Sequence, residues 1–209
     1  MARLRVAALA AVVLLAVATA CAPGTQTPVV GSGGVRPAAI DVDTPALRQA
    51  KQDAGIAPCR PGDAAPASEG LPDLTLPCFG GGQDVDLATL RGPLLVNVWS
   101  VNCGPCRTEM PILQRFHEKY GDRVGVLGID FQDVQTEAAM KLAVRSGVTY
   151  PLVADTQGAL ATADPVRLRA LPTTAMVDAD GRVVHVQAVE YKSLDQLVEA
   201  VRQHLGIDL

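Results

Sequence analysis

The sequence predicts an α/β fold with a mixed central sheet and helices on both faces. Strand-like and helix-like segments alternate between residues 94 and 146, which is the order that builds parallel strands joined by helices. Two more strand-like segments flank the turn sequence DADG at 178–181, which predicts an antiparallel hairpin. An amphipathic segment over 193–205 then predicts a helix that packs on the sheet.

The central elements follow from the spacing of apolar residues. Residues 94–99 form a nearly continuous apolar run, which is typical of a strand buried on both faces. A helix from about 105 to 120, a strand over 124–129 and a helix over 136–146 follow. We expect an earlier strand over 71–76, where the globular domain begins.

The hairpin strands are expected over 173–177 and 182–189. Ser193 and Gln196 have the spacing of a capping box, in which two side chains satisfy free backbone N–H groups of a first helical turn. The apolar residues of this last helix share one face: Leu194, Leu197, Val198, Val201 and Leu205.

The N-terminus carries the features of an export signal. Arg3 and Arg5 precede an unbroken apolar stretch, so residues 1–20 are predicted to be a signal peptide. Three small residues precede Cys21 and resemble the site at which bacterial lipoproteins are cleaved and acylated. We therefore expect lipid at Cys21 to anchor the protein to the outer face of the bacterial cytoplasmic membrane. The alternative is an ordinary secretory signal, in which Cys21 has no role.

Three further regions follow the signal peptide. Residues 21–40 are rich in Pro and Gly and predict a flexible tether. Residues 41–70 predict an N-terminal extension with one short helix, because Thr44-Pro45 can begin a helix and Gly55 can end it. Residues 71–209 are the predicted α/β domain.

Composition excludes two classes of function. Beyond the N-terminus no apolar run approaches the roughly 18 to 20 residues that a membrane-spanning helix requires, so a polytopic membrane protein is excluded. The net charge is −4 and the Lys and Arg residues are scattered. We expect no nucleic-acid partner, because nothing here would neutralise a row of phosphates.

The sequence contains five cysteines. If Cys21 carries lipid, four remain, and Cys103 and Cys106 form a C-x-x-C motif. Cys59 and Cys78 stand apart from that motif, and in an oxidising compartment the even remainder predicts a structural disulfide between them. The alternative is a second pair that exchanges electrons.

The C-x-x-C motif lies where the strand over 94–99 meets the following helix. A thiol at a helix N-terminus faces unpaired N–H groups and the positive end of the helix dipole, which favour the thiolate. We therefore predict that Cys103 is the nucleophile and that Cys106, one turn further, is the resolving thiol. Such a dithiol needs no other cofactor. Structural zinc is the alternative, but the sequence offers neither a second C-x-x-C nor paired histidines, so we expect no metal.

The segment NVWSVNCGPCRTEMP at 97–111 resembles the thioredoxin-like TlpA/ResA group of exported redoxins. The second point of resemblance is LPTT at 171–174, where thioredoxin folds carry a cis-proline that faces the C-x-x-C. The resemblance implies a thioredoxin fold, a main chain at Leu171 that pairs with a bound peptide, and a Pro172 that packs against the cysteines.

Two residues depart from thioredoxin itself. Asn97 stands where thioredoxin has a buried Asp, and Asn cannot take the proton of the resolving thiol. Members of the TlpA/ResA group often carry Glu at the position of Glu109, so Glu109 is the candidate base; a solvated surface carboxylate is the alternative. Asn102 replaces the usual Trp before the first cysteine.

The expected function is exchange with thiols and disulfides of exported proteins. The resemblance implies reduction of substrates such as apocytochrome c, with electrons from a membrane thiol carrier. Gly104-Pro105 is the dipeptide of thioredoxin, which is a reductant. Two alternatives remain at this point: oxidative disulfide formation in exported proteins, and a lipoprotein binding module whose redoxin site is vestigial.

Overall fold

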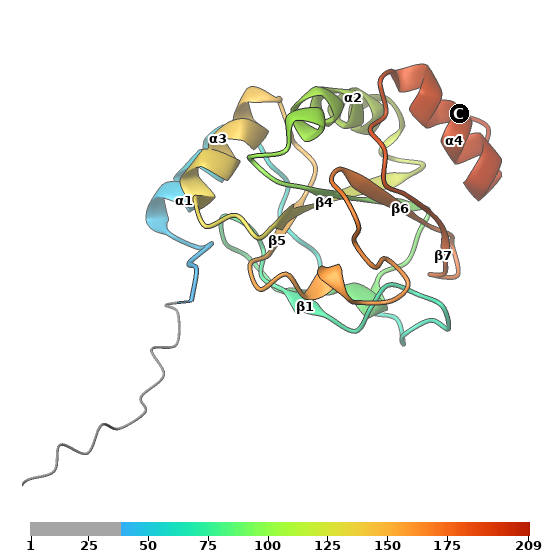
Figure 1. Ribbon diagram of the computed structural model, residues 1–209, viewed down its shortest axis with the longest axis horizontal. Coiled ribbons are helices and arrows are strands. Elements are labelled where there is room, and N and C mark those ends of the chain that lie inside the picture. Colours follow the sequence, from blue (N-terminus) through green and yellow to red (C-terminus); the bar gives the residue numbers. More distant parts are fainter. Residues whose placement is uncertain (1–38) are drawn as a thin grey trace, which may run out of the picture. The chain divides into compact units, whose positions relative to one another are not determined.

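The computed structural model describes residues 39–209, which form one compact unit (Figure 1). The signal peptide, Cys21 and nearly all of the tether lie outside the described residues. Within 39–209, no helix has the length and apolar character needed to cross a membrane. The elements are α1 (Pro45–Asp53), β1 (Thr75–Leu76), β2 (Val85–Asp86), η1 (Leu87–Thr89), β3 (Leu94–Trp99), α2 (Gly104–Tyr120), β4 (Gly125–Phe131), α3 (Thr136–Arg145), β5 (Leu152–Asp155), η2 (Ala159–Ala161), β6 (Thr173–Val177), β7 (Val183–Gln187) and α4 (Leu194–Leu205).

The main sheet has five strands in the order β5-β4-β3-β6-β7. β3 pairs in parallel with β4, and β4 in parallel with β5, through the crossover helices α2 and α3. β6 pairs antiparallel with β3, and β7 pairs antiparallel with β6 across the predicted turn. The predicted mixed sheet is therefore confirmed, and β3 lies at its centre.

The predicted helices on both faces are present only in part, because all four α-helices cover one face and the other carries only the short 3₁₀ helices η1 and η2. Leu95 and Trp99 of β3 face a core that α1, α2, α3 and α4 cover. Val96 and Val98 face a second core, which is covered by residues of β1, β2 and the short 3₁₀ helices η1 and η2. α2 and α3 share a face, as expected for right-handed crossovers that step across the sheet in the same direction.

The first predicted strand is wrong over most of its length. Only Thr75–Leu76 is a strand, and it pairs with Val85–Asp86 outside the main sheet. Pro72 has no N–H to donate to a ladder. The N–H of Leu74 donates to the Pro72 carbonyl at 2.8 Å, so this segment forms a turn where a strand was expected.

The N-terminal extension contributes side chains to the core on the helical face. Thr44 caps α1, since its Oγ1 accepts the Leu47 N–H at 3.2 Å, and Pro45 is the first residue of the helix. Leu47 is fully buried in the core, and α1 packs against α3. Val42 and Ile56 join the same core, so residues 39–70 are continuous with the rest of the domain.

Candidate redox site

Cys103 and Cys106 lie at the start of α2, directly after β3. They are joined by a disulfide, with their Cα atoms 5.3 Å apart. Cys103 is the N-cap residue of α2, and its Sγ accepts the Cys106 N–H at 3.1 Å. One sulfur therefore sits against a backbone donor at the positive end of a helix of 17 residues, an environment that favours a thiolate.

The two cysteines differ in exposure. Cys106 is fully buried and packs in the core on the helical face. Cys103 is only half-buried, and Asn102, Gly104 and Pro105 around it are exposed. A partner in solution can thus reach Cys103 and cannot reach Cys106, which is the asymmetry needed for one attacking and one resolving thiol.

Residues 171–172 precede β6 at the end of the sheet where β3 leads into the disulfide. The peptide bond between Leu171 and Pro172 is cis. β6 begins at the next residue, Thr173, which pairs with Val98 near the end of β3. Leu171 is half-buried and packs against the same core as Cys103. The two points of sequence resemblance are thus brought together by the antiparallel pairing of β3 with β6.

Glu109 is fully buried on the inner face of α2. Its Oε2 accepts a hydrogen bond from Asn97 Nδ2 at 2.8 Å, and its Oε1 accepts the Tyr191 N–H at 2.9 Å. Burial raises the pKa of this carboxyl to about 7; the hydrogen bonds from Tyr191 and Asn97 oppose the rise, and the nearby Glu190 adds to it. Glu109 can therefore hold or release a proton near neutral pH.

Asn97 connects Glu109 to the strand beside the cysteines. Its Nδ2 also donates to Thr174 Oγ1 at 3.0 Å. From the sequence, Asn97 was expected only to remove a base, and its role as the hydrogen-bond partner of Glu109 was not predicted. A usable signal was present, since Asn97 is the one polar residue in an otherwise apolar strand, and buried polar side chains are nearly always hydrogen-bonded.

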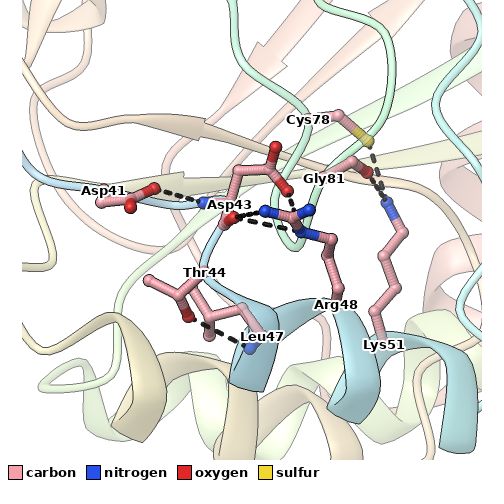
Figure 2. Close-up of polar contacts among 8 residues, drawn as sticks. All are labelled: Asp41, Asp43, Thr44, Leu47, Arg48, Lys51, Cys78 and Gly81. Carbon is pink, nitrogen blue, oxygen red and sulfur yellow. Dashed lines mark hydrogen bonds and ion pairs between the residues drawn. The ribbon is translucent and has the colours of Figure 1, made fainter.

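Cys59 and Cys78 form a second disulfide on the opposite face of the sheet, with their Cα atoms 5.8 Å apart. Both residues are buried. The ammonium of Lys51, on α1, donates to Cys78 Sγ at 2.9 Å and to the Gly81 carbonyl at 2.8 Å (Figure 2). Burial lowers the pKa of Lys51. This disulfide ties the segment after α1 to the segment after β1.

Removing this second disulfide is expected to destabilise the domain without removing the redox site. In the chain-entropy model, a loop closed by residues 19 apart contributes about 3 kcal/mol to the free energy of unfolding. We therefore expect C59S/C78S to unfold at lower denaturant concentration than the unaltered chain, whereas C103S/C106S should change stability less. Unfolding curves of the two double variants decide this, and an unchanged midpoint for C59S/C78S would contradict a stabilising role.

Within residues 39–209, no three or more His, Cys, Asp or Glu side chains are grouped so that they could hold a metal ion. The ring of His185 stacks on that of His204, with centroids 3.6 Å apart, between β7 and α4. His117 packs edge-on against Tyr150. The three histidines of the chain therefore lie in two separate places.

Comparisons with known proteins agree with this geometry. Residues 61–201 match the family model described as Redoxin. The chain is 24% identical over 125 residues to the thiol-disulfide oxidoreductase ResA of Halalkalibacterium halodurans, covering 58% of this chain and 69% of that protein. It is 35% identical over 113 residues to the thiol:disulfide interchange protein DsbE of Pseudomonas fluorescens, covering 53% and 60%.

A solved structure described as a secreted thiol-disulfide isomerase from Corynebacterium glutamicum matches with a TM-score of 0.54 and 26% identity. The match covers 62% of this chain and 81% of that one. The thioredoxin fold that the sequence resemblance implied is thereby confirmed.

Proposed function

Because this chain belongs to the Redoxin family, we propose that it is an exported reductant for disulfides of other exported proteins. Its enzyme class, a thioredoxin-like thiol–disulfide oxidoreductase of the TlpA/ResA type, is confirmed by the family match and the relatives. The observation that carries the site assignment is the asymmetric disulfide at the start of α2, with Cys103 reachable and Cys106 buried.

In the proposed reaction the reduced dithiol gives two electrons to a substrate disulfide. The Cys103 thiolate attacks one substrate sulfur, forming a mixed disulfide and releasing the other substrate sulfur as a thiolate. Cys106 loses its proton and attacks Cys103 Sγ, which releases the second substrate thiol and leaves the Cys103–Cys106 disulfide. Glu109 lies about one helical turn after Cys106 and is the proposed acceptor of that proton. The main chain at Leu171 is the proposed contact for the substrate backbone.

The direction of electron flow is proposed from the active-site dipeptide and the family resemblance. Gly104-Pro105 is the dipeptide of thioredoxin, whose potential lies near −270 mV. The TlpA/ResA group, which this chain resembles, reduces apocytochrome c before haem attachment. A membrane dithiol carrier is the proposed source of electrons, and apocytochrome c is the proposed substrate.

Export and anchoring are proposed from the N-terminal sequence. The signal-peptide pattern of residues 1–20 and the description of one structural relative as secreted both support export. The small residues before Cys21 support lipid attachment there, which would hold the domain at the membrane near its electron donor. The segment 21–40 would then be the tether.

The proposed function is tested by mixing the reduced full chain with a synthetic peptide that contains an oxidised C-x-x-C-H haem-attachment sequence. We expect two peptide thiols to appear for each Cys103–Cys106 disulfide that forms. If equilibrium instead favours the oxidised peptide and the reduced enzyme, the chain is an oxidant and the proposed direction is wrong.

A further inference from the structure

One buried side chain, which follows the neighbouring strand β4, holds the loop that joins β3 to Cys103. Asp133 lies just after the end of β4 and is 4% exposed. Its Oδ2 accepts the Val101 N–H at 2.6 Å, and its Oδ1 accepts the Ser100 hydroxyl at 3.0 Å. Both donors belong to the short segment 100–102 that leads into the C-x-x-C.

This attachment continues to the nucleophile through the backbone. The Ser100 carbonyl accepts the Cys103 N–H at 3.1 Å, and Cys103 in turn is the N-cap of α2. The Ser100 hydroxyl also receives the Asn102 N–H at 3.4 Å. A displacement of Ser100 would therefore move the residue whose sulfur attacks the substrate.

A second carboxyl, Asp130, lies beside Asp133. It is 2% exposed and sits at the end of β4, paired in register with Trp99 of β3. Asp130 Oδ1 is buried and no described residue donates a hydrogen bond to it, and the Asp133 side chain lies close enough to share a proton with Asp130. Two carboxyl groups in such contact need a proton between them, because two buried like charges repel. Burial, followed by the contact with Asp133, raises the pKa of Asp130 well above its usual range, so Asp130 holds that proton.

We propose that Asp133 is a positioning residue for the redox site, and that protonated Asp130 donates a hydrogen bond that keeps it in place. The proposal rests on thiol–disulfide exchange at Cys103 and adds to it a pair of residues that touch neither cysteine. With the proton on Asp130, Asp133 has three donors: one carboxyl, one hydroxyl and one backbone N–H. Asp130 and Asp133 together hold the loop before Cys103 in place against the central sheet.

The arrangement predicts a particular dependence on pH. When Asp130 loses its proton, two negative charges face each other in a buried site. The Asp133 carboxylate must then turn away from Asp130. Asp133 is the charged neighbour that raises the pKa of Asp130. Other carboxylates on adjoining elements include Glu109 of α2, which accepts hydrogen bonds from Asn97 and Tyr191, Asp155, whose oxygens accept N–H groups of η2, and Glu137 of α3, which is exposed. The exchange rate should therefore fall at alkaline pH, where a thiolate nucleophile alone would give a plateau.

The test uses the reduced full chain and four variants: D133A, D133N, D130N and the exposed control D84N. Rate constants for exchange with a small aromatic disulfide are measured from pH 5 to 10, with thermal unfolding of each variant alongside. We expect D133A to slow exchange about tenfold or more, because the attacking sulfur loses its fixed orientation. D133N keeps one acceptor oxygen and should fall between D133A and the unaltered chain.

D130N decides the proposal even if D133A is too unstable to assay. The amide of Asn can donate to Asp133 at every pH, so D130N should match the unaltered chain near neutrality and lose the alkaline decline. D84N should match the unaltered chain throughout. An alkaline decline that persists in D130N, or a rate for folded D133A equal to that of D84N, would overturn the proposal. Failure of the unaltered chain to exchange thiols at any pH would instead overturn the proposed function.

Discussion

Replacing Cys103 with serine is expected to abolish thiol–disulfide exchange, whereas replacing Cys106 with serine should leave the first attack intact and block only its resolution. The reason is their placement: Cys103 is half-buried at the helix start, and Cys106 is fully enclosed. C106S should therefore accumulate mixed disulfides through Cys103 with a substrate protein, and C103S should accumulate none. Mass spectrometry after non-reducing digestion identifies the trapped sulfur.

The matched control adds C59S/C78S to C106S, which removes the second disulfide and should not change which sulfur is trapped. Alkylation of the reduced protein at pH 6 gives an independent check, since Cys103 should react far faster than Cys106. Equal alkylation rates for the two thiols would contradict their assignment as nucleophile and resolving thiol.

Replacing Glu109 with glutamine is expected to slow the resolving step about a hundredfold, which is the lower end of the rate acceleration that a general base usually provides. The pKa of Glu109 is about 7, so in the unaltered chain the resolving rate should rise with pH up to about that value as the carboxylate forms. E109Q should lack this rise. Single-turnover kinetics that separate the first attack from resolution measure the effect, and an unchanged resolving rate in E109Q would remove Glu109 from the mechanism.

The same substitution should change how stability depends on pH. The pKa of Glu109 is raised from 4.5 to about 7 by folding, so the folded state favours the protonated acid. Its stabilising contribution is complete below about pH 4.5 and is lost as the pH rises to about 7, a difference of about 3 kcal/mol. As the pH rises through this range, the free energy of unfolding of the unaltered chain should therefore fall by that amount relative to that of E109Q. Parallel curves for the two proteins would contradict the burial of an ionising Glu109.

Local sequence patterns were sufficient to predict the structure of segments whose conformation depends mainly on their own residues. The apolar run at 94–99 can be buried only at the centre of a sheet, and it forms β3 with those bounds. Asp178 caps its own turn by accepting the N–H groups of Asp180 and Arg182, so the hairpin was predictable from four residues. The Thr44 cap of α1 is local in the same way.

Contacts between distant segments were not predictable from those patterns. Glu109 and Tyr191 are 82 residues apart, and Asp133 and Val101 are 32 apart, so neither hydrogen bond leaves a periodic signal. The predicted strand at 71–76 failed over most of its length because Leu71 packs into the second core from outside any strand, and only Leu76 does so from the two-residue β1. Apolar spacing indicates burial there, but it does not specify which backbone groups pair.

The reduction potential of the Cys103–Cys106 couple tests the proposed reductase most directly. It is measured by equilibrating the full chain with thiol–disulfide buffers and quantifying the oxidised fraction. The fluorescence of Trp99, the only tryptophan of the chain and a member of the same core as Cys106, offers a signal. A reductant with the thioredoxin dipeptide should have a potential near −270 mV. A value more oxidising than about −180 mV, the level of disulfide isomerases, would contradict the account and assign the chain to oxidative folding.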